Sequence, residues 1–308
     1  MSKRKPHNIS AFLLPDWMNR KPQAVAEKET YVDLEMGPAP LTQAQKAGDQ
    51  KQSCEVIVIT SGKGGVGKTT ATANIGMCIA RMGYRIALVD ADIGLRNLDL
   101  LLGLENRVVY TAMEVMEGTC TLDQALVKDK RWKNLSMLAM SKNRQRYNIT
   151  RSNMLMIIDA LKERGFQYIL IDCPAGVDIG FANAIAPANQ AVVVTTPEIT
   201  SMRDADRVIG IIEQTDNIKK VSVLVNRVRI DMIKTNDMMS VQDVVALLGL
   251  PLVGAIPEDP NVIISTNRGE PLVLQKNLTL AGVALEDAAR TLIGFPGPST
   301  QKGWGNVR

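Results

Sequence analysis

The chain has 308 residues and a formal net charge of +4, with 45% hydrophobic and 22% charged residues. These proportions exclude a largely disordered or collagen-like chain, and the length allows one or two domains that bury a sizeable core. The mildly basic balance does not by itself indicate nucleic-acid binding. The single histidine, His7, excludes a histidine-based triad or a histidine-rich metal site in the folded core. No uninterrupted apolar run approaches the roughly 20 residues needed to span a bilayer.

The first 53 residues are rich in Pro, Gln, Lys and Ala and have no sustained periodicity. We therefore predict an N-terminal extension over residues 1–53 that is disordered or serves as a leader. Inside it, the apolar and aromatic residues of 12–18 lie between two basic clusters. This segment is compatible either with a contact to a membrane or partner, or with a leader that has no folded role.

Short β-branched runs alternate with helical patterns over residues 54–293, which we predict to form one domain. The runs predict strands at 55–60, 85–89, 168–171, 191–194, 221–225 and 252–256. Apolar residues at i, i+3 and i+4 predict helices at 70–82, 153–164, 201–214, 241–248 and 280–292. Strands that are apolar on both faces and alternate with helices indicate an α/β fold, with a mostly parallel twisted sheet and helices on both faces.

Residues 62–69 match the phosphate-binding pattern G-x-x-x-x-G-K-[ST] between a predicted strand and a predicted helix. The glycines allow a tight loop whose N–H groups point at phosphate oxygens, and the following helix presents its positive end. Lys68 is expected to neutralise the β- and γ-phosphates, and the Thr69 hydroxyl to bind Mg²⁺. These features predict a P-loop NTPase. The predicted nucleotide-binding residues of this loop are Gly62, Lys63, Gly64, Gly65, Val66, Gly67, Lys68, Thr69 and Thr70.

Carboxylates follow two of the predicted strands, at the edge of a parallel sheet where ligands bind. Asp172 ends the strand at 168–171 and is expected to hold Mg²⁺; the alternative is an ordinary carboxylate at a strand end. Asp90 and Asp92 end the second strand, and only one of them is expected to face the γ-phosphate. We assign Asp92 to orienting the attacking water and Asp90 to the magnesium shell, with a turn-forming role as the alternative for Asp90.

Asn226 ends the strand at 221–225. Its amide offers a donor and an acceptor, the pair needed to read adenine, while a cap of a helix or turn is the alternative. Residues 257–260 follow the last strand and either close over the base or form a simple turn.

The nonapeptide Gly62–Thr70, G-K-G-G-V-G-K-T-T, resembles the deviant Walker A signature of the P-loop ATPase class that contains the MinD, ParA and nitrogenase-iron-protein families. The segment Asp90–Asp99 resembles the switch I segment of the MinD family of septum-site-determining ATPases. The resemblance covers about residues 55–293 and is closest to cyanobacterial and plastid members. Further similar stretches are 107–110, 124–131, 172–176, 203–207 and 256–259.

The resemblance implies an ATPase that uses ATP and Mg²⁺ as a spatial switch in division-site placement. In that class, ATP brings two subunits face to face, so Lys63 would reach the partner's nucleotide and act in catalysis with Lys68 and Asp92. The dimer would bind an anionic membrane and recruit a division inhibitor, and a topological-specificity protein would stimulate hydrolysis. These partners would compete for the surface bearing Asp204 and Asp206. The implied location is a bacterial cytoplasm or a plastid stroma, peripheral at the inner face of the membrane.

Residues 294–308 are predicted to form a flexible tail, because Gly and Pro recur after Ile293. This tail departs from the family, whose members typically end in a short basic amphipathic helix that binds membrane. The departure leaves the position of any membrane anchor open.

Two other members of the class are alternatives. A ParA-type partition ATPase would need a basic DNA-facing surface, for which Lys219, Lys220, Arg227 and Arg229 are the candidates. The segment resembling MinD switch I argues against it, and no DNA partner is expected. An electron-transfer protein like the nitrogenase iron protein would need cysteines from both subunits to hold a cluster, and Cys173 lies at the wrong spacing for that family.

Overall fold

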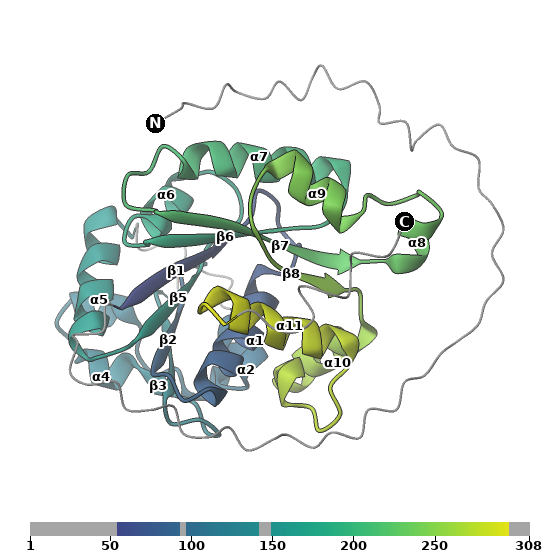
Figure 1. Cartoon of the computed structure of the whole chain (residues 1–308). Helices are drawn as coiled ribbons and strands as arrows, with labels where there is room; N and C mark the ends of the chain where they lie inside the picture. The colour runs from purple at the N-terminus through teal and green to yellow at the C-terminus, as the bar shows by residue number, and fades with distance from the viewer. Residues whose placement is uncertain (1–53, 93–96, 142–148, 296–308) are drawn as a thin grey trace.

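The computed structural model describes residues 54–92, 97–141 and 149–295 (Figure 1). Its eight strands form a single sheet with the spatial order β3-β4-β2-β5-β1-β6-β7-β8. Every neighbouring pair is parallel except β3 with β4. The predicted α/β class with a mostly parallel sheet is therefore confirmed. The strands are β1 (Glu55–Thr60), β2 (Ile86–Asp90), β3 (Val127–Lys128), β4 (Leu135–Ala139), β5 (Tyr168–Asp172), β6 (Gln190–Thr195), β7 (Lys220–Val228) and β8 (Leu252–Pro257).

Helices cover both faces of the sheet (Figure 1). The four longest, α1, α5, α7 and α11, connect or follow strands and carry most of the helical core. Two short 3₁₀ turns occupy Glu105–Arg107 and Leu272–Leu274. The helices are α1 (Lys68–Arg81), α2 (Leu98–Leu102), α3 (Ala112–Met116), α4 (Leu122–Ala125), α5 (Arg151–Glu163), α6 (Ile179–Ile185), α7 (Ile199–Ile212), α8 (Ile230–Lys234), α9 (Val241–Leu248), α10 (Pro260–Arg268) and α11 (Leu280–Leu292).

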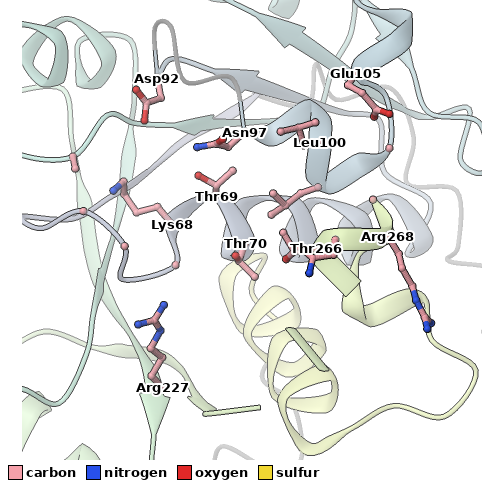
Figure 2. A pocket seen from close by; sticks show the side chains of 18 residues that line it. Lys68, Thr69, Thr70, Asp92, Asn97, Leu100, Glu105, Arg227, Thr266 and Arg268 are labelled. Atoms are coloured by element: carbon pink, nitrogen blue, oxygen red, sulfur yellow. The ribbon is translucent and has the colours of Figure 1, made fainter. Parts of the chain in front are cut away.

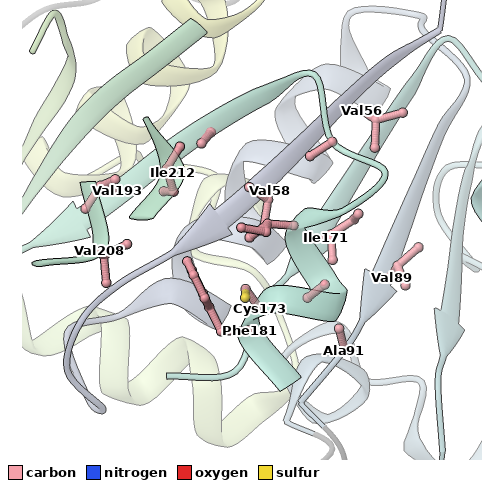
Figure 3. Packing of buried hydrophobic residues seen from close by; sticks show 14 of the residues in the cluster. Val56, Val58, Val89, Ala91, Ile171, Cys173, Phe181, Val193, Val208 and Ile212 are labelled. Carbon is pink, nitrogen blue, oxygen red and sulfur yellow. The ribbon is translucent and has the colours of Figure 1, made fainter. Parts of the chain in front are cut away.

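Successive residues of a central strand enter two different cores, because side chains alternate between the faces of a sheet. Val56 and Val58 of β1 belong to the core shared with α5, α6, α7 and α9, which includes Phe181 (Figure 3). Ile57 and Ile59 belong to the opposite core, shared with α1 and α11. Burying one such side chain contributes about 1.5–3 kcal/mol, so both layers stabilise the packing of the helices on the sheet.

The sheet places the carboxyl ends of β1, β2 and β5 at one edge. Asp90 and Asp172 are register partners across β2 and β5, and Ile59 of β1 pairs with Asp172. The chain leaves β1 toward β2 on one side, and leaves β5 toward β6 on the other. Such a reversal of direction opens a crevice outside the strand ends, where ligands of α/β proteins bind.

Several elements were not predicted from the sequence. The run of β4 contains Leu, Ser, Met and Ala in place of β-branched residues, and β3 has only two residues. Helix α10 begins directly after Asp259, whose side chain accepts a hydrogen bond from the Asn261 N–H (2.8 Å). Residues 257–260 were predicted either to close over the base or to form a simple turn. The cap formed by Asp259 favours the local structural role. Within the described ranges, none of the helices is both long and apolar enough to cross a membrane.

The boundaries predicted for the terminal segments are not tested by the fold. Residues 1–53 and 296–308 lie outside the described residues, and so does the apolar and aromatic segment at 12–18. Residues 93–96 of the segment Asp90–Asp99 also lie outside them. The proposed N-terminal extension and C-terminal tail therefore stay predictions.

Candidate nucleotide-binding site

The loop between β1 and α1 has the backbone geometry that phosphate binding requires. Gly65 and Gly67 adopt φ values of 78° and 101°, which residues with a Cβ rarely reach. Gly67 is the N-cap of the 14-residue α1, and no side chain caps that helix end. The first N–H groups of α1 consequently remain available to an anion, at the positive end of the helix dipole.

Lys68 is held inside the loop by a residue that the sequence pattern did not identify. Lys68 is 8% exposed as a residue. Its ammonium donates to the Ser61 hydroxyl (3.0 Å), and that hydroxyl donates to the Lys63 carbonyl (2.6 Å). Ser61 thus links the buried cation to the loop backbone. Its position just before the motif, outside the consensus, explains why the pattern does not reveal it.

A cavity of about 680 Å³ opens in front of the loop (Figure 2). This size lies within the range of small-molecule sites. One wall consists of loop and α1 residues, including Lys68 and Thr69, and Asp92 faces the cavity from the end of β2. The other wall comes from α2 and α10. Lining residues that the sequence did not predict are Asn97, Leu100, Leu101, Gly103, Glu105, Ala175, Arg227, Thr266, Asn267, Arg268 and Gly269.

Asp90 and Asp172 form a buried carboxylate pair beneath this cavity. Asp90 accepts hydrogen bonds from the N–H groups of Asp92 (3.1 Å) and Leu98 (3.2 Å), so it ties the end of β2 to the start of α2. Asp172 accepts a 3.4 Å bond from the Thr72 hydroxyl. The turn-forming role considered for Asp90 is present, and its role toward Mg²⁺ stays a prediction.

Burial raises the pKa of both carboxyl groups well above the ordinary range of aspartate, and like charges nearby raise it further. Backbone N–H groups oppose the rise at Asp90, and the Thr69 hydroxyl and the Lys68 charge oppose it at Asp172. A divalent cation would relieve this repulsion. No group of three or more His, Cys, Asp or Glu side chains in the described part of the chain can hold a metal alone. Mg²⁺ sites of this kind take oxygens from substrate phosphates and water, which fits the donors present here.

The raised pKa values predict that the protein without Mg²⁺ and nucleotide loses stability as pH rises. Between about pH 4, where aspartate ordinarily titrates, and neutral pH, the folded state binds more protons than the unfolded state. The free energy of unfolding should therefore fall by up to about 1.4 kcal/mol per pH unit for each excess proton. Urea unfolding at pH 5 and pH 7.5 measures this decrease in the free energy of unfolding. The decrease should be smaller in Asp90→Asn. If the free energy of unfolding of the wild-type protein rose with pH over this interval, the raised pKa values of the buried pair would be contradicted.

Asn226 lies against the loop. Its side-chain amide donates to the Val66 carbonyl (2.7 Å), and a Cβ on Gly67 would lie 2.3 Å from that amide nitrogen. The amide therefore braces the phosphate loop in this conformation. Its predicted contact with adenine stays a prediction.

Lys63 and Lys68 occupy different environments. Lys68 lines the cavity, whereas Lys63 is absent from the described lining residues. The Lys63 side chain is 47% exposed, and its ammonium lies 3.8 Å from the Glu198 carboxylate at the start of α7. An exposed pair of this kind contributes roughly 0–1 kcal/mol, so Lys63 can leave it at little cost.

Helix α7 packs directly on the phosphate loop. A Cβ built on Gly62 would lie 2.1 Å from the backbone oxygen of Asp204 and 2.3 Å from its carbonyl carbon. Asp204 and Asp206 are themselves half-buried on this helix. The sequence-predicted partner surface is thus in backbone contact with the loop that would bind phosphate.

Gly62→Ala should destabilise the protein by about 1–3 kcal/mol, because the new methyl group forces α7 and the loop apart. Gly64→Ala is the matched control, since a Cβ there meets no atom within 4 Å and Gly64 has no positive φ. Urea unfolding of both variants checks the difference. Equal stability of the two would mean that α7 does not press on the loop.

The basic residues considered for DNA binding do not form one surface. Lys219 and Lys220 lie at the start of β7, while Arg227 lines the nucleotide cavity near the other end of that strand. Arg229 pairs with the carboxylates of Asp231 and Glu258, at 2.7 and 3.7 Å. The length of β7 separates the two lysines from the two arginines. The geometry therefore gives the ParA-type alternative no support.

The cysteine positions give no support to a shared metal cluster. Cys173 is 1% exposed, and burial raises the pKa of its thiol. Cys78 is also buried, and the four cysteines of the chain are free.

Comparison with known proteins gives concordant matches. A family model described as "ParA: NUBPL iron-transfer P-loop NTPase" matches residues 52–293. The chain is 73% identical to the putative septum site-determining protein MinD of Nephroselmis olivacea, over 82% of the chain and 93% of that protein. It is 59% identical to the chloroplastic septum site-determining protein minD homolog of Arabidopsis thaliana, over 77% of the chain and 74% of that protein.

Solved structures agree with these matches. The MinC:MinD cell division complex of Aquifex aeolicus contains a chain with a TM-score of 0.74 and 47% identity, covering 80% of this chain and 98% of that one. The Pyrococcus horikoshii septum site-determining protein MinD, solved with Mg-ADP, gives a TM-score of 0.70 and 28% identity. The match covers 78% of this chain and 96% of that one.

Proposed function

Because the chain belongs to the MinD family of septum-site-determining P-loop ATPases, we propose that it hydrolyses MgATP as a dimerising switch that helps to place the division site. The Mg-ADP bound to the Pyrococcus relative supports an adenine nucleotide with Mg²⁺ as the ligand of the described cavity. The uncapped α1 terminus, the buried Lys68 and the carboxylate pair fit a magnesium-bound polyphosphate.

Each residue has a distinct role in this proposal. Backbone N–H groups of the loop and α1 bind the phosphates, and Lys68 neutralises charge on the β- and γ-phosphates. Thr69, Asp90 and Asp172 would hold Mg²⁺ directly or through water, and the bound ion would supply neutralisation of phosphate charge. Asp92, half-buried at the cavity wall, orients the attacking water.

The orientation of Lys63 is the observation that carries the dimeric mechanism. Lys63 belongs to the phosphate-binding motif, yet its side chain is half-exposed beside Glu198 and does not line its own cavity. A second subunit facing this edge would receive that cation at its γ-phosphate. A cation supplied in trans to a phosphoryl-transfer site stabilises the charge of the transition state and completes the site only in the dimer.

The α7 surface is the proposed site for a division inhibitor and for an activator. The MinC:MinD complex of the Aquifex relative supports an inhibitor of the MinC type as one partner. A protein that binds Asp204 and Asp206 would act on a helix whose backbone touches Gly62. Partner binding could therefore alter the phosphate loop without entering the cavity.

The proposed location is peripheral, on an anionic membrane facing a plastid stroma or a bacterial cytoplasm. The chloroplastic Arabidopsis relative supports the plastid. The membrane anchor is not assigned, because residues 1–53 and 296–308 lie outside the described residues.

Sedimentation of Asp92→Asn with ATP, ADP or no nucleotide tests the switch. This variant should bind ATP without hydrolysing it, so it should form dimers in ATP alone and pellet with anionic vesicles only in that state. The wild-type ATPase rate per subunit should rise with protein concentration. A monomer in ATP, together with a rate that is independent of concentration, would contradict the proposal.

A further inference from the structure

A second cavity, of about 230 Å³, lies at the edge of the sheet opposite the phosphate loop. Arg85 immediately precedes β2 and Ser136 lies at the start of β4, whereas the phosphate loop follows the carboxyl end of β1. The remaining walls come from the α4–β3 segment and from the end of α5, which lie on one flank of the molecule (Figure 1). Because these strands are parallel, the two cavities are separated by the height of the sheet.

Positive charge dominates this second cavity. Its lining includes four cationic side chains, Arg85, Lys128, Lys133 and Arg164, but a single carboxylate, Asp123. Asp123 is already paired with Arg164, at 2.9 Å from Oδ1 to Nε. Among the described residues, the other three cations have no carboxylate within ion-pair distance. Three like charges around a small concave space focus a positive potential that attracts anions.

Two residues in the cavity wall, Arg85 and Ser136, are held in place by the packing around them. The Arg85 guanidinium lies over the ring of the buried Phe166, 5.2 Å from its centroid, which limits its freedom. Ser136 is 5% exposed and lines the cavity, and no protein partner of its hydroxyl is found in the described part of the chain. A bound oxyanion would give this hydroxyl an acceptor and would meet a cation that is already positioned.

We propose that this second cavity binds a phosphate or sulfate group, carried either by a small metabolite or by the headgroup of an anionic lipid. The excess of three positive charges matches a tetrahedral dianion better than a single carboxylate, which would leave two cations without a counter-charge. The volume holds one such group with a short extension, and is too small and too enclosed for a run of nucleic-acid backbone.

The free-ligand arm of the test uses inorganic phosphate and sulfate as probes. The full chain is first saturated with MgADP, so that the phosphate loop is occupied. At about ten times the dissociation constant, phosphate should raise the unfolding midpoint by roughly 2–4 °C relative to chloride at the same ionic strength. The double variant Lys128→Gln with Lys133→Gln should lose this shift. The control pair Lys219→Gln with Lys220→Gln removes two lysines from the same edge of the sheet and should retain it.

The lipid arm compares vesicles of phosphatidylglycerol with vesicles of phosphatidylcholine, in ATP. None of the four lysines lines the nucleotide cavity, so all variants should keep the wild-type ATPase rate. Loss of phosphatidylglycerol binding in the Lys128/Lys133 variant alone identifies the headgroup as the source. Unchanged vesicle binding with loss of the phosphate shift identifies a free ligand. Wild-type behaviour of this variant in both arms would overturn the site.

Discussion

Lys68→Ala should weaken MgATP binding by about 30- to 4,000-fold and reduce hydrolysis at least as much. Removing one partner of a desolvated, charge-assisted contact costs about 2–5 kcal/mol. Lys68 is a buried cation, and its ammonium donates a hydrogen bond to Ser61. The affinity is measured by titrating a fluorescent ATP analogue with Mg²⁺ present.

Ser61→Ala is the matched control for Lys68. It keeps the cation and removes one neutral hydrogen bond, worth about 0.5–1.5 kcal/mol, so the affinity should fall by no more than about 13-fold. If Lys68→Ala bound ATP as tightly as Ser61→Ala, the lysine would not contact the phosphates.

Lys63→Ala should reduce hydrolysis by about 10³-fold or more, the scale seen when a trans-acting cation is removed from a phosphoryl-transfer site. MgATP binding by the monomer should change by less than about threefold, because this side chain lies outside its own cavity. Single-turnover hydrolysis and nucleotide titration separate the two quantities.

Glu198→Ala is the companion variant of Lys63→Ala, because it removes the carboxylate that lies 3.8 Å from the Lys63 ammonium. That variant should hydrolyse ATP at the wild-type rate or faster. A large fall in nucleotide affinity for Lys63→Ala would mean that the lysine serves its own site.

The secondary structure was predictable where local chemistry and tertiary packing agree. The β-branched run of β1 and the patterns of α9 and α11 have the predicted boundaries, and Ser240 and Thr279 cap those two helices. Short elements were not predictable. A helix of four or five residues has too few turns to display a period, and the Leu-Ser-Met-Leu-Ala run of β4 has no β-branched residue.

The site was predictable as far as one contiguous motif extends. Gly64, Gly65, Gly67, Lys68 and Thr69 of the motif all line the cavity, whereas Gly62 lies against α7. The opposite wall comes from α10, about 200 positions away, and no local signal couples Thr266 or Arg268 to the motif. Arg227 and the contact of α7 with Gly62 likewise arise from tertiary approach. Ser61 is a local neighbour of the motif, but it lies one position outside the consensus.

The trans action of Lys63 is tested most directly by mixing two inactive variants, Lys63→Ala and Asp92→Asn, and measuring ATP hydrolysis. In a mixed dimer, one site would combine an intact Asp92 with the partner's intact Lys63, while the other site would lack both. When equal amounts of the two variants pair at random, about half of the dimers are mixed. Each mixed dimer has one functional site out of two, so we predict recovery of about a quarter of the wild-type rate. If both residues served the same subunit, neither site of a mixed dimer would be complete. A rate no higher than that of the separate variants would contradict the dimeric mechanism.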